Sequence, residues 1–124
     1  MSDRLDTLVH VGWTTFRVIA TINEFTTEAC DHDGPACYEL AIAGPRGGDL
    51  RIVYVGETQN ERARMTCYGR DGSHLSKIIR QHLRNGWHLY YRGWATPTKK
   101  AAITLQNRLL SKSRYDWNIQ LNGD

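Results

Sequence analysis

Residues 50–64 read Leu-Arg-Ile-Val-Tyr-Val-Gly-Glu-Thr-Gln-Asn-Glu-Arg-Ala-Arg. The first six of these residues are mostly apolar and β-branched, which predicts a central strand. Gly56 then allows a backbone or a substrate to come close at the end of the strand. A helix capped at Thr58 or Asn60 follows and carries Arg64. The stretch therefore predicts one strand-to-helix junction with a tyrosine before it and an arginine after it.

Two other runs predict strands. Residues 37–42 alternate imperfectly and pair antiparallel with residues 50–55 through the Gly-rich connection at residues 44–49. Residues 87–94 are rich in aromatic side chains and predict a third strand. One face of this third strand carries Trp87, Leu89 and Tyr91. Residues 115–119 predict a short extended tail.

The remaining segments predict helices. The helix that carries Arg64 is expected to end near Tyr68-Gly69. Ser73 is the expected cap of a second helix with apolar side chains at helical spacing, and Asn85-Gly86 ends it. The turn at residues 96–98 caps a last helix over residues 99–111.

Together these elements predict an α/β (α+β) fold with a small three-stranded antiparallel sheet flanked by helices. The order is strand, strand, helix, helix, strand, helix, and the domain spans residues 34–120. Residues 1–33 are expected to form an N-terminal extension packed on the core. Within it, residues 8–13 favour a short strand, and residues 15–19 continue that strand or begin a helix. A chain of 124 residues suits one domain with one core.

Composition narrows the class of protein. The chain is 40% hydrophobic and 23% charged, and it has no apolar run of the roughly 20 residues that a membrane span needs. The acidic, polar N-terminus does not match a secretion signal, so we expect a cytoplasmic protein without a membrane partner. Three cysteines argue against a disulfide framework. Cys30, His32 and Cys37 could support a zinc-stabilised interaction domain, although their spacing matches no paired zinc motif.

Charge is unevenly distributed along the chain. The first fifty residues carry three basic and eight acidic residues, whereas residues 51–124 carry thirteen basic and five acidic residues. A basic C-terminal part of this size can collect a polyanion such as nucleic acid. The cations expected to contact it are Lys77, Arg80, Arg84, Arg92, Lys99, Lys100 and Arg108.

Two half-motifs point to a family. Gly34-Pro35-Ala36-Cys37-Tyr38 and Tyr54-Val55-Gly56, with Arg64 eight residues further on, resemble the signature of the GIY-YIG nuclease family. Tyr68 stands where members carry tyrosine or histidine, and His74 stands where some members place a histidine.

The C-terminal part of the chain adds to the resemblance, which covers residues 34–120. Residues 101–110 resemble the family's glutamate helix, but Gln106 stands in the glutamate's place. Residues 115–118, Tyr-Asp-Trp-Asn, resemble the closing signature that contains Asn118.

The resemblance implies a metal-dependent DNA endonuclease with one Mg²⁺ or Mn²⁺ ion. Tyr38 is the candidate general base and Arg64 the phosphate clamp. Tyr54 and Tyr68 supply proton-handling or orienting hydroxyls, and His74 is a further catalytic candidate. A tyrosine of ordinary pKa, about 10, needs a nearby cation to act as a base.

The resemblance also adds Gly56 and Asn118 to the residues expected to bind nucleic acid. A homodimer would double the contacts with DNA, and no obligatory protein partner is evident.

Gln106 is the departure that bears on activity. A neutral amide is a poor Mg²⁺ ligand, so we expect this chain to be impaired or inactive. Gln106 could be an introduced change, or a natural feature of a module that binds nucleic acid without cutting it. Alternatively, Glu57 or Glu39 supplies the missing carboxylate.

Overall fold

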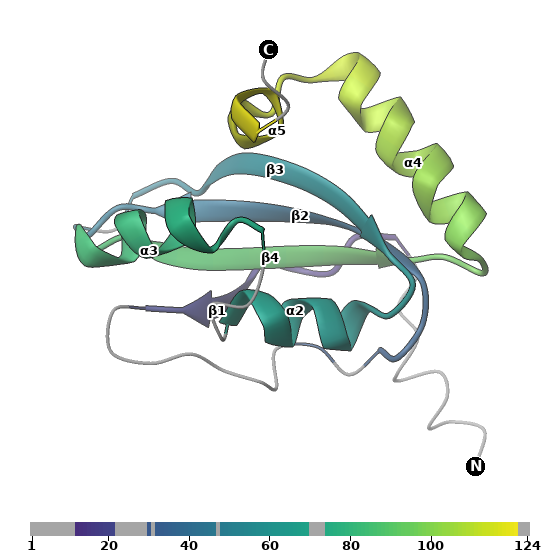
Figure 1. Cartoon of the computed structure of the whole chain (residues 1–124), viewed down its shortest axis with the longest axis horizontal. Coiled ribbons are helices and arrows are strands. Elements are labelled where there is room, and N and C mark those ends of the chain that lie inside the picture. Colours follow the sequence, from purple (N-terminus) through teal and green to yellow (C-terminus); the bar gives the residue numbers. More distant parts are fainter. Residues whose placement is uncertain (1–11, 22–29, 31, 47, 70–73, 122–124) are drawn as a thin grey trace.

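A computed structural model describes residues 12–21, 30, 32–46, 48–69 and 74–121. A single antiparallel sheet has helices on both faces (Figure 1). The strands, in chain order, are β1 (Arg17–Ala20), β2 (Ala36–Ala43), β3 (Arg51–Thr58) and β4 (His88–Ala95). The helices are α2 (Glu61–Gly69), α3 (Ser76–Arg84), α4 (Lys99–Lys112) and α5 (Asp116–Leu121). No helix in the described ranges is both long and apolar enough to cross a membrane.

The predicted α+β class and the antiparallel pairing of β2 with β3 are confirmed, but the sheet has four strands instead of three. Its order is β1-β4-β2-β3, so β3 lies at an edge and its predicted central position is wrong. The apolar character of β3 reflects helices on both of its faces and does not require partners on both of its edges. The additional strand, β1, comes from the N-terminal extension and pairs with β4. Of the strand expected over residues 8–13, residues 8–11 lie outside the described residues.

Two apolar clusters form on the two faces of the sheet. The larger one joins Tyr38 and Leu40 of β2 to Met65 of α2 and Ile79 of α3. The smaller one lies on the opposite face, where Cys37, Val55 and Tyr115 meet the α4 side chains Leu105 and Leu109. Every residue of β2 is buried, because helices cover both sides of this strand.

A β-bulge changes which side chains of β3 share a face. Leu40 pairs with Tyr54 and Ala41 pairs with Ile52, so Val53 is an extra residue in β3. An extra residue shifts the alternation of side chains along a strand. As a result, Val53 joins Tyr54 on the face that carries α2 and α3.

The C-terminal tail is a short helix, α5, and the predicted extended tail is wrong. Local pattern could not indicate this, because the segment is held by contacts with the edge of β3. The side-chain amide of Asn118 accepts a hydrogen bond from Val55 N and donates one to Val55 O, each 2.9 Å long. Tyr115 packs in the smaller cluster and Trp117 in the larger one. The tail therefore holds β3 from its edge and from both faces.

Capping residues fix two helices where the sequence predicts them. Asn60 Oδ1 accepts a hydrogen bond from Ala63 N at the start of α2, and Thr98 Oγ1 accepts one from Ala101 N at the start of α4. Ser73, the expected cap of α3, lies outside the described residues.

A buried carboxylate links the sheet to the tail. The Arg92 guanidinium contacts Glu39 Oε1 at 2.6–2.7 Å, and the Tyr115 hydroxyl donates a hydrogen bond to Glu39 Oε2. Arg92 also stacks on the ring of Trp13, 4.4 Å from its centroid. Both oxygens of Glu39 are therefore engaged, which leaves this carboxylate unsuited to hold a metal ion.

The described residues contain no group of three His, Cys, Asp or Glu side chains that could hold a metal ion. Cys30 packs in the larger cluster and Cys37 in the smaller one, on opposite faces of the sheet. The sheet itself separates the two thiols, so this geometry does not support the alternative of a zinc site at Cys30, His32 and Cys37.

We predict that Asn118→Ala lowers the free energy of unfolding by about 1–3 kcal/mol, because two buried backbone groups of Val55 lose their partner. Chemical denaturation measures the change. Asn107→Ala is the matched control, because Asn107 is exposed on α4, and it should shift stability by less than about 0.5 kcal/mol. Equal effects of the two substitutions would contradict the role given to Asn118.

Candidate active site

Two buried tyrosines form the base of the site. Tyr38 of β2 and Tyr68 of α2 are each 1% exposed, and their hydroxyl oxygens lie 2.5 Å apart. Burial is the main cause that raises the pKa of Tyr38 well above its ordinary value, and Tyr68 and Tyr54 add to it. Tyr38 is therefore a protonated, interior hydroxyl at neutral pH.

Gly56 makes room for this arrangement. It pairs with Tyr38 across β2 and β3, and the Tyr38 ring lies over it. A Cβ atom at position 56 would lie 2.5 Å from the Tyr38 hydroxyl oxygen, which real contacts do not permit. Gly56 therefore makes room for the side chain of Tyr38 at the end of the strand. This packing role differs from the predicted contact of Gly56 with nucleic acid.

Tyr54 and His74 form the part of the site that lies at the surface. Tyr54 is half-buried, and its hydroxyl oxygen lies 3.2 Å from Nε2 of the exposed His74. The Tyr54 and Tyr38 ring centroids are 6.3 Å apart, so the surface pair lies directly beside the buried pair. Burial raises the pKa of Tyr54, and the charge of Glu57 adds to that rise, whereas Arg64 opposes it.

Arg64 of α2 is half-buried among these side chains. Its positive charge favours the ionised form of each tyrosine and so acts to lower the pKa of Tyr38, Tyr54 and Tyr68. For His74, burial lowers the pKa and the Arg64 charge lowers it further. The structure therefore brings together all five residues predicted to be catalytic, from β2, β3, α2 and the segment before α3.

A hollow of about 380 Å³ lies beside this cluster and shares Arg64 with it. Glu57, at the end of β3, and Lys99, at the start of α4, line the same hollow. The Oε1 atom of Glu57 is buried and has no hydrogen-bond partner among the residues that the structure describes. A carboxylate in this state is a candidate cation ligand. Its signal in the sequence is an acidic residue directly after Gly56.

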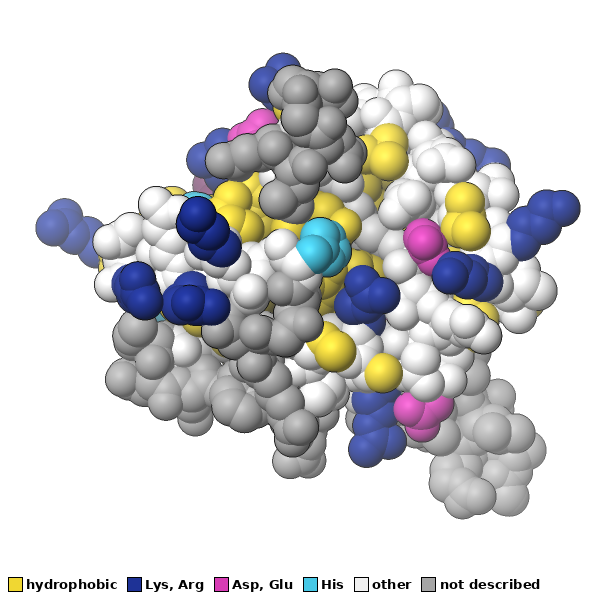
Figure 2. Space-filling view, in the orientation of Figure 1, with side chains coloured by type: hydrophobic (Ala, Val, Ile, Leu, Met, Phe, Trp, Pro, Cys, Tyr) yellow, Lys and Arg dark blue, Asp and Glu magenta, His cyan; other side chains and the backbone are white. Residues whose placement is uncertain are grey.

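Six of the seven predicted nucleic-acid-binding cations divide between two faces, and the seventh, Arg92, is instead paired with Glu39. Lys77, Arg80 and Arg84 are exposed on α3, and Lys and Arg side chains gather over this part of the molecule in Figure 2. Lys99, Lys100 and Arg108 are exposed on α4, which packs on the opposite face of the sheet. Only Lys99 lies beside Arg64. Asn118 is buried and engaged with Val55, so the structure gives it a part in holding β3.

The arrangement of two strand-end tyrosines with an arginine on the next helix agrees with a comparison with protein families. The model of the GIY-YIG domain-containing proteins matches residues 27–124. The chain belongs to the GIY-YIG family. It therefore carries a nuclease-type domain, and the predicted family resemblance is confirmed.

The curated proteins that the chain resembles are longer than it is. Protein EFFECTOR OF TRANSCRIPTION 3 of Arabidopsis thaliana is 38% identical over 73 residues, which cover 58% of this chain and 27% of that protein. UvrABC system protein C of Synechococcus sp. (strain CC9902) is 30% identical over 90 residues, or 73% of this chain and 13% of that protein. The chain thus spans about a quarter or less of these relatives. No solved structure matches it.

GIY-YIG nucleases generally depend on a divalent metal ion, so the donor groups of this chain matter. Gln106 is half-buried on α4 and offers only a neutral amide. Glu57 offers a carboxylate oxygen that no other described residue hydrogen-bonds, in a hollow next to Arg64. Mg²⁺ is often bound through one or two carboxylates together with substrate phosphates and water. The residues present therefore fit an ion that is completed by the substrate.

We predict that the pKa of His74 lies below its ordinary value and rises in Arg64→Gln, because the neighbouring positive charge is removed. Titration of the imidazole signals by NMR measures both values. Arg62→Gln is the control on the same helix, since Arg62 is exposed and pairs with Asp33. A His74 pKa that does not respond to Arg64→Gln would show that the two side chains are not neighbours in solution.

Proposed function

We propose that this chain is a DNA endonuclease domain that hydrolyses phosphodiester bonds with a divalent cation. We assign the contact with the attacking water to Tyr54 instead of Tyr38. Tyr54 is half-buried and ends in a surface hydrogen bond with His74, whereas the Tyr38 hydroxyl is buried against Tyr68. This difference in depth between the two half-motif tyrosines is the observation that carries the proposal.

His74 solves the difficulty that a tyrosine is a weak base at neutral pH. The lowered pKa of His74 leaves its ring neutral at pH 7, with Nε2 able to accept the Tyr54 hydroxyl proton. As the Tyr54 oxygen takes a proton from water, its own proton passes to His74 Nε2. The pair can then act as a general base although the pKa of Tyr54 itself is raised.

Arg64 supplies a fixed positive charge for the phosphate. Its guanidinium stays protonated and presents planar donors that match phosphate oxygens. Lys99 brings a second cation to the same hollow. Tyr38 and Tyr68 form the packed floor under this region, which restricts Arg64 and Tyr54 to a narrow range of positions.

Glu57 is the proposed ligand of the divalent cation. An ion bound there supplies positive charge to the scissile phosphate and the leaving oxygen. Without a cation, the charge of Glu57 raises the pKa of Tyr54 and so opposes base catalysis. Because Gln106 adds only a neutral amide, we propose that the ion, Mg²⁺ or Mn²⁺, is held weakly and that cleavage is slow.

DNA would approach across the face that carries α3. The exposed cations Lys77, Arg80 and Arg84 lie on the helix that follows His74, and these residues suit the phosphates that flank the cleaved bond. A second candidate function, binding of nucleic acid without cleavage, is favoured by Gln106 alone.

We predict slow cleavage of plasmid DNA by the unaltered chain with Mg²⁺ or Mn²⁺, and a rise of at least about tenfold in Gln106→Glu, because a carboxylate adds a ligand for the ion. Tyr54→Phe should lower the single-turnover rate by about 10²-fold or more. Tyr90→Phe, on β4, is the control.

The cleavage rate of the unaltered chain should fall as the pH drops through the pKa of His74, because the protonated ring no longer accepts a proton.

Two outcomes would redirect this assignment. Equal rates for the unaltered chain and Gln106→Glu would remove position 106 from the cation site. Full binding of DNA with no cleavage by either form would favour the binding module.

We predict that Glu57→Gln weakens Mn²⁺ binding by at least about tenfold in the presence of an uncut oligonucleotide, because it removes the charged ligand. Electron paramagnetic resonance of free Mn²⁺ measures this affinity independently of cleavage. Asp49→Asn, exposed in the connection before β3, is the control for lost charge. Unchanged affinity in Glu57→Gln would exclude Glu57 as the ligand.

A further inference from the structure

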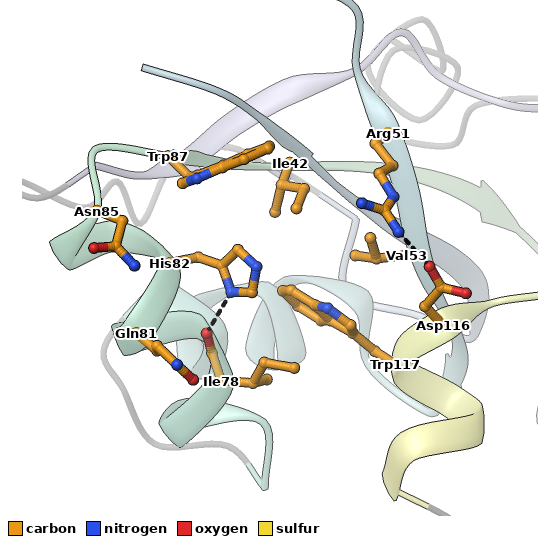
Figure 3. Close-up of a pocket in the computed structure, with 10 residues that line it drawn as sticks. All are labelled: Ile42, Arg51, Val53, Ile78, Gln81, His82, Asn85, Trp87, Asp116 and Trp117. Carbon is orange, nitrogen blue, oxygen red and sulfur yellow. Dashed lines mark hydrogen bonds and ion pairs between the residues drawn. The ribbon is translucent and has the colours of Figure 1, made fainter. Parts of the chain in front are cut away.

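A second cavity lies on the same face of the sheet as Tyr54. It has a volume of about 400 Å³ and lies between α3, the ends of β2 and β3 near residues 42 and 51, and α5 (Figure 3). Pockets that take small ligands begin at roughly 300 Å³, so this one can enclose a group of the size of a single ring system. None of the residues predicted to be catalytic lines it.

Aromatic rings form two walls of this cavity. Trp87 and Trp117 lie on opposite sides of His82, whose ring centroid is 5.8 Å from that of Trp87 and 5.3 Å from that of Trp117 (Figure 3). Ile78 and Val53 complete the apolar lining. Walls of this kind favour a flat, apolar-faced ligand over an extended aliphatic one.

Polar groups surround the same space. The Nδ1 atom of His82 lies 2.9 Å from the Ile78 carbonyl oxygen, and because a carbonyl only accepts, Nδ1 carries the proton. In the neutral ring Nε2 is then an acceptor, and Figure 3 shows this second nitrogen turned toward the cavity. The exposed amides of Gln81 and Asn85 add donors and acceptors on the α3 side.

The charged groups at the cavity argue against a simple anion site. Arg51 is the single Lys or Arg among the described residues that line it, and it forms an ion pair with Asp116, another lining residue. A phosphate there would meet the Asp116 carboxylate. A neutral ring with donors and acceptors on its edge meets no such repulsion.

Because β3 carries both Val53 of the cavity and Tyr54 of the catalytic cluster, the two sites are neighbours. From Arg51 to Tyr54 the strand advances three residues, or about 10 Å at ~3.3 Å per residue. The bulge at Val53 places the side chains of both sites on one face. The helix α3 also connects the two sites, since His74 of the catalytic cluster precedes it and His82 of the cavity lies in its last turn.

We propose that this cavity binds a nucleobase of the substrate strand, unstacked from its neighbours, close to the phosphate that is cut. The proposal rests on the proposed nuclease function for the identity of the strand, but recognition of the base itself does not need cleavage. Trp87 and Trp117 offer apolar ring surface to the base, and Gln81, His82 and Asn85 meet its hydrogen-bonding edge. Nucleases that work this way recognise an unpaired or extruded nucleotide.

Titration of the ¹⁵N-labelled chain with each of the four deoxynucleosides tests the proposal, read from the indole N–H signals of its four tryptophans. We expect saturable shifts at Trp87 and Trp117 with at least one nucleoside. Trp13 and Trp94 are internal controls, because they pack against each other away from the cavity, 5.4 Å between centroids. Inorganic phosphate at the same concentration should shift neither pair.

The double variant Gln81→Ala/Asn85→Ala should weaken nucleoside binding by at least about fivefold, since each amide loses a hydrogen bond to the base edge. Both side chains are exposed, so the fold should persist, and Asn107→Ala is the matched control. The proposal is overturned by shifts that are absent, by shifts equal at all four tryptophans, by shifts caused by phosphate, or by binding unchanged in the double variant. Because the nucleosides carry no phosphodiester, the result is independent of whether the chain cuts DNA.

Discussion

The hydrogen bonds between the Asn118 amide and the backbone of Val55 hold together the parts on which the site depends. An edge strand has unpaired backbone groups, and here a side-chain amide satisfies a donor and an acceptor as a neighbouring strand would. With β3 held in this way, Trp117 can insert on one face and Tyr115 on the other. The position of Tyr54, one residue before Val55, follows from the same contact.

The tyrosines of the site differ in how deeply their hydroxyl groups are buried. Because Gly56 lacks a side chain, the Tyr38 ring packs directly over it, and the Tyr38 hydroxyl contacts that of Tyr68. Tyr54 is half-buried, and its hydroxyl lies within reach of His74 at the surface. A GIY-YIG domain of this form therefore has one layer of phenols that supports the site and one phenol that faces solvent. Arg64 acts electrostatically on both layers.

Local signals were enough to predict most elements, because turn residues such as Asn85-Gly86 and caps such as Thr98 act over a few positions. Features that depend on distant contacts were not predictable. The edge position of β3, the pairing of β1 with β4 and the helical tail each follow from packing between remote segments. In the site, motif spacing identified the five side chains that meet, but not which tyrosine is buried. The cavity between Trp87 and Trp117 had no signal, since the two residues lie thirty positions apart.

The strand β1 has a consequence for how the domain can be divided. The family match begins at residue 27, so Arg17–Ala20 lie outside it although they cover the edge of β4. A fragment cut at the family boundary would keep Tyr38, Tyr54 and Arg64 but leave the outer edge of β4 unpaired at residues 89–91, where β1 covers it. Uncovered edges of this kind pair with other chains. Self-association of such a trimmed domain would then reflect a missing strand and not a natural oligomer.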